Sequence, residues 1–174
     1  VTAIGRIARA KVKYRSGARE NDIVYVTGYL GDSAQGLLDI RSGVYDSPFV
    51  AVHHDPHPCV NEGIWLGNQP EVHAMMDISD GLSSELLHIC RQSNTGCRIY
   101  EERIPIDYQT AVMAEEFNMS LITAALNGGE DYELLFTVPL AKHDDISALP
   151  GIRIIGHITA PSLGAYMITR DGAE

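Results

Sequence analysis

The sequence predicts an α/β fold, a mixed sheet covered by helices, built as a single domain over residues 1–174. Hydrophobic residues make up 45% of the chain, which is enough for a packed core and too many for a disordered protein. Short β-branched and aromatic runs bounded by turn residues alternate with stretches of helical periodicity. Such alternation is typical of a sheet packed against helices, and it leaves the order of the strands open.

Turn residues delimit the elements of the first part of the chain. Residues 23–27 (IVYVT) form an expected strand because they are β-branched or aromatic and stand between turn residues. A short helix over residues 32–40 follows, with Asp32 or Ser33 as its expected cap. Residues 42–71 are rich in Gly, Pro, His and Asn, so we expect a long surface excursion, with a short helical piece left open.

The remaining elements follow from the same signals. An apolar run ending at Asp77 predicts a strand, and apolar residues at helical spacing predict an amphipathic helix from Leu82 to about Ser93. An Asn-Thr-Gly sequence ends that helix. The other expected elements are strands over 97–100, 132–138, 152–158 and 165–169, and helices over 107–117 (capped by Asp107), 121–126 and 141–149.

Charge and composition exclude several classes of protein. The formal net charge is −10, which disfavours binding to nucleic acid or to anionic membranes and suits a protein that recruits cations. No apolar run approaches the roughly 20 residues of a membrane span. Cys59, Cys90 and Cys97 are odd in number and lack CxxC spacing, which favours a reducing cytoplasm over a disulfide framework or a zinc knuckle. Because the chain begins with Val1, we expect a fragment of a longer protein.

Two carboxylates mark the end of the strand in the segment MMDISDGLSSEL. Asp77 would stand at the carboxyl end of the strand and Asp80 in the turn before the helix. At a separation of about 5 Å and an effective dielectric constant of about 20, their repulsion is about 3 kcal/mol. A divalent cation relieves that repulsion, and oxygen ligands beside a glycine turn suit Mg²⁺, with Ser79 able to contact a phosphate or the metal. By spacing alone, simple turn and cap roles for the two acids are favoured, because Asp is a preferred turn and cap residue.

Two further segments carry polar groups at turns. In NGGEDYELLF, Glu130 and Asp131 precede a strongly apolar strand, and a turn with solvated acids is the alternative interpretation. In YRSGARENDIVYVTG, Arg15 and Arg19 flank a Ser-Gly turn, where an arginine can form a bidentate contact with phosphate. Surface arginines without such a role are common. The histidines and the cysteine of residues 53–59 (HHDPHPC) suggest zinc, but two prolines cramp the spacing and favour a surface loop.

Taken together, these segments resemble the thiamine-monophosphate kinase family. The matching sequences are R-S-G-A from Arg15, Y-V-T-G-Y-L-G-D-S-A from Tyr25, D-I-S-D-G-L from Asp77 and G-G-E-D-Y-E-L-L-F from Gly128. Their order and spacing are similar to the C-terminal region of that family, and they cover nearly the whole chain. The fold implied is the C-terminal domain of the aminoimidazole-ribonucleotide-synthetase-like superfamily.

The resemblance implies ATP- and Mg²⁺-dependent phosphorylation of thiamine monophosphate to thiamine diphosphate. By matching position it implies Asp77 and Asp80 as Mg²⁺ ligands, Ser79 and Arg15 as ATP contacts, and Glu130 as a contact to thiamine monophosphate. No catalytic residue is assigned, since the acceptor phosphate has a second pKa of about 6 and needs no general base at neutral pH. The chain lacks G-x-x-x-x-G-K-[ST], which excludes a P-loop kinase on its motif.

The chain also departs from the family pattern. Glu85 stands where the family usually has Asp, and residues 53–59 replace an arginine-rich stretch. The family's N-terminal domain, which binds Mg-ATP and forms much of a homodimer, is expected outside this chain, so the fragment alone should be inactive. Two alternatives remain: another ATP-dependent enzyme of the superfamily with a different acceptor, and a non-catalytic interaction or regulatory module.

Overall fold

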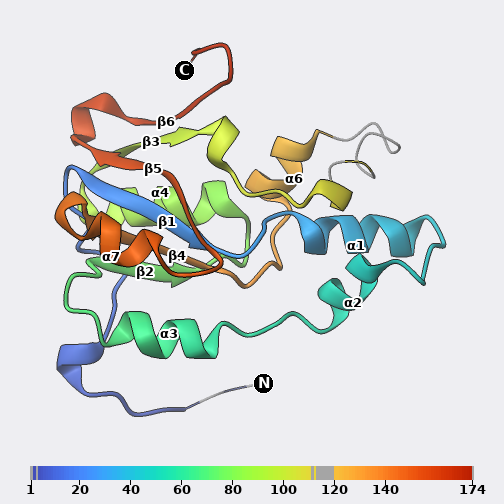
Figure 1. Ribbon diagram of the computed structural model, residues 1–174, viewed down its shortest axis with the longest axis horizontal. Helices are drawn as coiled ribbons and strands as arrows, with labels where there is room; N and C mark the ends of the chain where they lie inside the picture. The colour runs from blue at the N-terminus through green and yellow to red at the C-terminus, as the bar shows by residue number, and fades with distance from the viewer. Residues whose placement is uncertain (1, 3, 111, 113–119, 174) are drawn as a thin grey trace.

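The computed structural model describes residues 2, 4–110, 112 and 120–173. Six strands form one sheet in the order β2-β4-β1-β5-β3-β6 (Figure 1). All neighbouring strands are antiparallel except β3 and β6, so the sheet is mixed, as predicted. The strands are β1 (Asp22–Thr27), β2 (Ala74–Asp77), β3 (Gly96–Tyr100), β4 (Leu134–Pro139), β5 (Ile152–Thr159) and β6 (Ala165–Ile168).

Helices lie on both faces of this sheet and beyond one end of it (Figure 1). The α-helices are α1 (Asp32–Arg41), α2 (Pro48–His54), α3 (Val60–Gly67), α4 (Leu82–Ser93), α6 (Leu121–Asn127) and α7 (His143–Ser147). Short 3-10 turns are η1 (Arg9–Lys11), η2 (Glu101–Arg103), η3 (Leu140–Lys142) and η4 (Pro161–Leu163). No helix in the described parts of the chain combines the length and hydrophobicity needed to cross a bilayer.

Three expected elements differ in detail from the structure. The surface excursion over 42–71 holds two helices, and α2 begins where the Ser47 hydroxyl accepts the Phe49 N–H at 3.2 Å. The helix expected over 141–149 is a 3-10 turn followed by the five residues of α7. The strand expected from residue 132 begins at Leu134, because Tyr132 has a φ of 54°, which is incompatible with an extended strand.

The helix expected over 107–117 is described only at its start. The Asp107 carboxylate accepts the Gln109 N–H at 2.8 Å, as the predicted cap should, and residues 108–110 are helical. Residues 111 and 113–119 lie outside the described residues.

Each face of the sheet carries its own apolar core. On one face α4 packs Leu82, Leu86 and Ile89 against the strands, which confirms the predicted amphipathic helix. On the other face the rings of Tyr25 and Phe136 stack 5.4 Å apart. Leu66 of α3 and Ile146 of α7 cover them, so helices cover the sheet from both sides.

The strand order brings three chain segments to one edge of the sheet. Both β1 and β2 run antiparallel to β4, so their carboxyl ends lie beside the amino end of β4. The segments that follow Thr27 and Asp77 therefore meet the segment that precedes Leu134. The segments after Asp77 and before Leu134 contain the two predicted acidic turns.

Candidate nucleotide and metal site

The two acidic turns are joined by backbone hydrogen bonds. The N–H groups of Glu130 and Tyr132 donate to the carbonyl oxygens of Ser79 and Ile78, at 2.8 and 2.9 Å. The Ile78 N–H in turn donates to the Glu133 carbonyl at 2.8 Å. Residues 77–80 and 130–133, which the sequence alone treats as separate turns, therefore form one rigid structure.

Gly129 allows the two turns to come this close. Its φ is 67°, and a Cβ at this position would lie 2.6 Å from the Ser79 carbonyl oxygen and 3.1 Å from the Asp80 carbonyl carbon. Only glycine fits such a contact with the backbone. The glycine pair of the G-G-E-D motif thus has a packing function as well as a turn function.

The predicted metal ligands face solvent at this junction, with a buried acid behind them. Asp77 and Asp80 are exposed, whereas Glu85 of α4 is only 1% exposed. One Glu85 oxygen accepts the Asp80 N–H at 3.4 Å, and the other, Oε2, is buried with no hydrogen-bond partner. Burial, and then the charges of Asp80 and Asp77, raise the pKa of Glu85. The junction therefore gathers the carboxyl groups of Asp77, Asp80 and Glu85.

Glu130 is held beside the same charges. Its φ is 60°, and its carboxylate accepts the Tyr132 hydroxyl at 2.8 Å. The hydrogen bond and the charge of Glu130, with smaller contributions from Asp77 and Asp80, raise the pKa of Tyr132. The electrostatic coupling indicates that Glu130, Tyr132, Asp77 and Asp80 belong to one site, which includes the predicted substrate contact and both predicted metal ligands.

The structure places the Arg15 backbone beside both α4 and β2. The Arg15 carbonyl accepts the Ser93 hydroxyl at 3.4 Å, so its backbone lies at the last residue of α4. The turn with Asp80 precedes the first residue of that helix, and twelve helical residues span about 18 Å. The neighbouring Tyr14 carbonyl accepts the Met75 N–H at 3.0 Å, so the Arg15 backbone also lies beside β2, the strand that ends at Asp77, whereas Ser79 lies within the acidic turns themselves.

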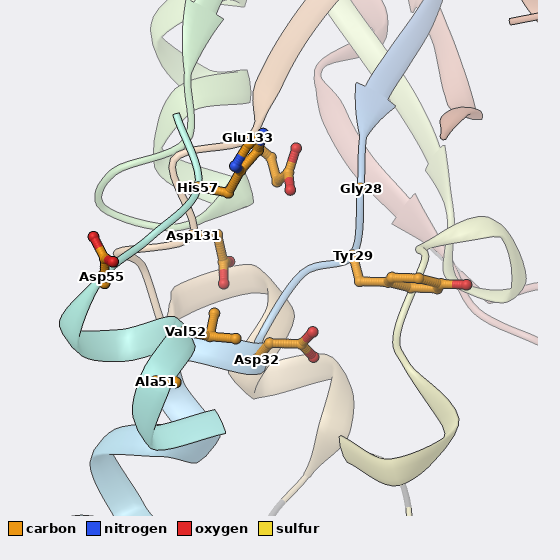
Figure 2. Close-up of a pocket in the computed structure, with 9 residues that line it drawn as sticks. All are labelled: Gly28, Tyr29, Asp32, Ala51, Val52, Asp55, His57, Asp131 and Glu133. Atoms are coloured by element: carbon orange, nitrogen blue, oxygen red, sulfur yellow. The ribbon is translucent and has the colours of Figure 1, made fainter. Parts of the chain in front are cut away.

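A hollow of about 380 Å³ lies next to these turns, and the sequence analysis did not identify it (Figure 2). Four carboxylates line it, those of Asp32, Asp55, Asp131 and Glu133. Three of them come from the quoted motifs Y-V-T-G-Y-L-G-D-S-A and G-G-E-D-Y-E-L-L-F, which were the signal available in the sequence. Only the strand order shows that these motifs share one hollow.

Glu133 connects three segments at the floor of this region. It accepts a hydrogen bond from the hydroxyl of Thr27 at the end of β1, and one from the Cys59 thiol at 3.1 Å. Burial raises the pKa of Cys59 to about 11, so the thiol stays protonated and can donate. Glu133 is therefore largely engaged within the fold.

The side chains of residues 53–59, the segment considered for zinc, contact different parts of the fold. His53 Nδ1 lies 2.9 Å from the Ser33 hydroxyl, His57 lines the acidic hollow, and Cys59 contacts Glu133. In the described parts of the chain, no three side chains of His, Cys, Asp or Glu converge as a metal-binding group would. The surface loop expected here is in part helical, since His53 and His54 end α2.

Asp131 caps α1, a role that the sequence analysis assigned to Asp32 or Ser33. Neither of these side chains caps the helix; the N-cap is Gly31, with a φ of 92°. Both oxygens of Asp131 lie 3.1 Å from the Gly31 nitrogen, and the Ser33 N–H also donates to this carboxylate. Asp131 is only 7% exposed, so the alternative of a solvated acid is wrong for this residue. The prediction failed because the cap comes from 100 residues away in the chain.

The burial of Asp131 makes stability depend on pH. Burial raises its pKa to about 7, although the N–H groups of Gly31 and Ser33 act in the opposite direction. An Asp in the unfolded chain has a pKa of about 3.9, so the folded chain retains a proton that the unfolded chain releases between about pH 4 and pH 7. The free energy of unfolding therefore falls as the pH rises through that window, by at most about 4 kcal/mol.

We expect Asp131→Asn to remove this contribution. The amide oxygen can still accept the Gly31 N–H, and no charge is buried above pH 7. Urea unfolding of wild type and variant from pH 4.5 to 8 should show a smaller decline of stability with pH in the variant. Parallel pH profiles for the two proteins would contradict the buried, proton-binding role of Asp131.

The donor set at the acidic turns fits a magnesium ion. Asp77 and Asp80 offer two exposed carboxylates beside the buried carboxyl group of Glu85, one oxygen of which has no hydrogen-bond partner. Mg²⁺ keeps several waters and is usually bound by one or two carboxylates together with substrate phosphates. Two protein carboxylates are therefore sufficient, and a cage of three or more is not required.

Comparison with known proteins shows similarity to one family over most of the chain. Residues 19–166 match the family described as AIR synthase related protein, C-terminal domain. The chain is 35% identical over 157 residues to thiamine-monophosphate kinase from Buchnera aphidicola subsp. Acyrthosiphon pisum (strain APS), covering 83% of this chain and 47% of that protein. The chain spans about half the length of the curated relatives it matches.

Solved structures show the same fold. The crystal structure of thiamine-monophosphate kinase from Stenotrophomonas maltophilia K279a aligns with a TM-score of 0.83 and 27% identity, covering 95% of this chain and 55% of that one. AaThiL complexed with AMPPCP and TMP aligns with a TM-score of 0.79 and 31% identity, covering 92% and 50%. The mixed sheet with its helices is therefore a fold that this chain shares with those proteins.

Proposed function

This chain belongs to the AIR synthase related family, whose C-terminal domain it matches, and from that premise we propose that it is the C-terminal part of a thiamine-monophosphate kinase. The reaction proposed is ATP- and Mg²⁺-dependent phosphorylation of thiamine monophosphate to thiamine diphosphate. We further propose that an ATP-binding and dimerising N-terminal domain lies outside the chain. Support comes from the relatives at about 35% identity and from the similar fold of AaThiL complexed with AMPPCP and TMP.

One observation within the chain carries the proposal. Backbone hydrogen bonds join residues 77–80 to residues 130–133, which brings the proposed metal ligands Asp77 and Asp80 beside the proposed acceptor contact Glu130. Phosphoryl transfer requires a donor phosphate and an acceptor held in line, with their negative charges neutralised. A site that combines carboxylates for a metal with a contact to the acceptor meets that requirement.

The residues of the chain would act by positioning rather than by proton transfer. Asp77 and Asp80 would hold Mg²⁺, which when bound neutralises phosphate charge. Ser79, in the same turn, would contact the nucleotide, and Glu130 would orient the acceptor while its carboxylate stays fixed by Tyr132. Because a phosphate monoester is mostly a dianion at neutral pH, it can attack directly without a general base and without a phosphoenzyme.

The role of Arg15 is proposed from the resemblance alone. An arginine suits a nucleotide phosphate, and the Arg15 backbone lies beside β2, where the Tyr14 carbonyl accepts the Met75 N–H. We expect replacement of Arg15 to raise the KM for ATP of the full-length protein, whereas replacement of Asp77 or Asp80 should lower kcat. A homodimer of the full-length protein and a cytoplasmic location are part of the same proposal; the three unbridged cysteines agree with a reducing compartment.

The test is a turnover assay of the full-length protein with ATP and Mg²⁺. We expect chromatographic detection of thiamine diphosphate from thiamine monophosphate, and no phosphoryl transfer to unphosphorylated thiamine, because the dianionic acceptor is then absent. ATP hydrolysis stimulated by another phosphate acceptor, without formation of thiamine diphosphate, would assign the protein to a different reaction of the superfamily. Absence of any ATP turnover in a folded full-length protein would favour a non-catalytic module.

A further inference from the structure

A second hollow, of about 400 Å³, lies away from the acidic turns. It opens on the sheet face that α3 and α7 cover, because its wall includes Ile23 and Ile154 of that apolar core. Asn21 at its rim precedes β1, whereas the acidic turns adjoin the other end of that strand. Six strand residues separate the two regions by about 20 Å.

The chemistry of this hollow is opposite to that of the acidic site. Its polar lining consists of a guanidinium, two imidazoles, a phenol and an amide, and no carboxylate of the described residues lines it. These polar groups belong to Asn21, Tyr100, Arg103, His143 and His157. We call the cavity that they line the basic hollow. In a chain with a net charge of −10, such a concentration of donors is unusual and favours an anionic ligand.

A bulge in β5 builds the floor. The pairing between β1 and β5 shifts so that Val24 faces Gly156 and Tyr25 faces Ile154. As a result Ile154 and His157, three residues apart, both line the hollow, where a regular strand would place them on opposite faces. A Cβ at Gly156, between them, would lie 2.0 Å from the Arg98 carbonyl oxygen, so glycine at this position allows β3 and β5 to pair closely beside the hollow.

The aromatic groups are arranged for a planar ligand. The rings of Tyr100 and His157 stack with centroids 6.0 Å apart, and the guanidinium carbon of Arg103 lies 5.9 Å from the Tyr100 centroid. Nδ1 of His143 and of His157 lies 3.0 and 3.4 Å from a tyrosine hydroxyl. In the described parts of the chain, neither ring has a partner at Nε2, which leaves that nitrogen for a ligand.

We propose that the basic hollow binds an aromatic ring that carries a phosphate group, in the class of a mononucleotide. The ring would lie against Tyr100 and His157, and the phosphate would accept hydrogen bonds from Arg103 and His143. A volume of about 400 Å³ is within the usual range for small-ligand sites. This site is separate from the acidic turns and requires no metal, so the inference does not rest on the proposed kinase reaction.

The histidine signals of the chain allow a direct test. We propose to titrate the full-length protein with AMP in the presence of EDTA and to follow by ¹H–¹³C NMR the ring Cε1–H signals of its histidines, seven of which belong to this chain. His143→Asn and His157→Asn spectra assign the two relevant signals. Saturable shifts of the His143 and His157 signals, with His57 of the acidic hollow unchanged, are the expected result.

Variants and simpler ligands identify the chemistry. Arg103→Gln should weaken AMP binding at least 10-fold, whereas Arg91→Gln, which changes an exposed arginine on α4, should not alter it. Adenosine and inorganic phosphate should each bind at least 10-fold more weakly than AMP. Equal binding of phosphate and AMP, unchanged binding by Arg103→Gln, or shifts confined to His57 would each overturn the proposal.

Discussion

Replacing Asp77 by Asn in the full-length protein is expected to lower kcat for formation of thiamine diphosphate at least about 100-fold. The carboxylate is exposed at the end of β2 and is one of two proposed protein ligands for the metal. A metal ion contributes several kcal/mol to stabilisation of phosphoryl charge, and each 1.36 kcal/mol corresponds to a factor of ten in rate. Steady-state kinetics with varied Mg²⁺ measure the effect, and Asp80→Asn should behave similarly.

Asp46→Asn provides a matched control for this experiment. Asp46 is exposed in the turn before α2, so its substitution should leave kcat and the Mg²⁺ dependence unchanged. Because Asp77 makes few contacts with the core, Asp77→Asn should unfold at the same urea concentration as wild type. Undiminished turnover by a folded Asp77→Asn protein at limiting Mg²⁺ would remove the metal assignment.

Gly129→Ala is expected to destabilise the chain by about 3 kcal/mol and to disrupt the site together with the fold. The left-handed backbone conformation costs a residue with a Cβ about 1–2 kcal/mol. The added methyl would also lie 2.6 Å from the Ser79 carbonyl oxygen, so the turns must separate and weaken the hydrogen bond from Glu130 to Ser79. The midpoint and slope of urea unfolding give the change in free energy.

Gly43→Ala separates the cost of the left-handed backbone conformation from the cost of the close contact. Gly43 has a similar φ, 81°, but nothing lies within 4 Å of the position of an added Cβ. Its replacement should cost only the conformational part, about 1–2 kcal/mol, and should leave turnover of the full-length protein unaffected. Equal destabilisation by the two substitutions would show that the close contact between the acidic turns does not contribute to the free energy of unfolding.

The sequence predicts much of the fold because its signals are local. The β-branched run of residues 23–27 and the helical periodicity from Leu82 to Ser93 each determine an element through backbone preference and burial of one face, and both predictions are confirmed. The predicted start of β4 at residue 132 was wrong. The left-handed conformation of Tyr132 depends on contacts of its backbone with residue 78, which the local sequence does not indicate. Boundaries of this kind are decided by the neighbours of a segment rather than by its own composition.

The same distinction holds for the site. Asp77, Asp80 and Glu130 were identified as candidates from the motifs D-I-S-D-G-L and G-G-E-D-Y-E-L-L-F. Carboxylates at the ends of predicted strands can be recognised from the sequence alone. The basic hollow gave no such signal, because its residues come from separate segments and depend on a bulge in β5. The position of the Arg15 backbone beside α4 and β2 was likewise invisible in the sequence, since it depends on contacts with Ser93 and with β2, which lie far along the chain.

By itself the sequence determined the elements, their α/β class and the chemical character of each acidic turn, because these depend on residues adjacent in the chain. Only the tertiary structure decided that the two turns share backbone hydrogen bonds, that Asp131 caps α1 and that four carboxylates face one hollow. The physical reason is that strand order and register bring together groups up to 100 residues apart, and no local pattern records those distances.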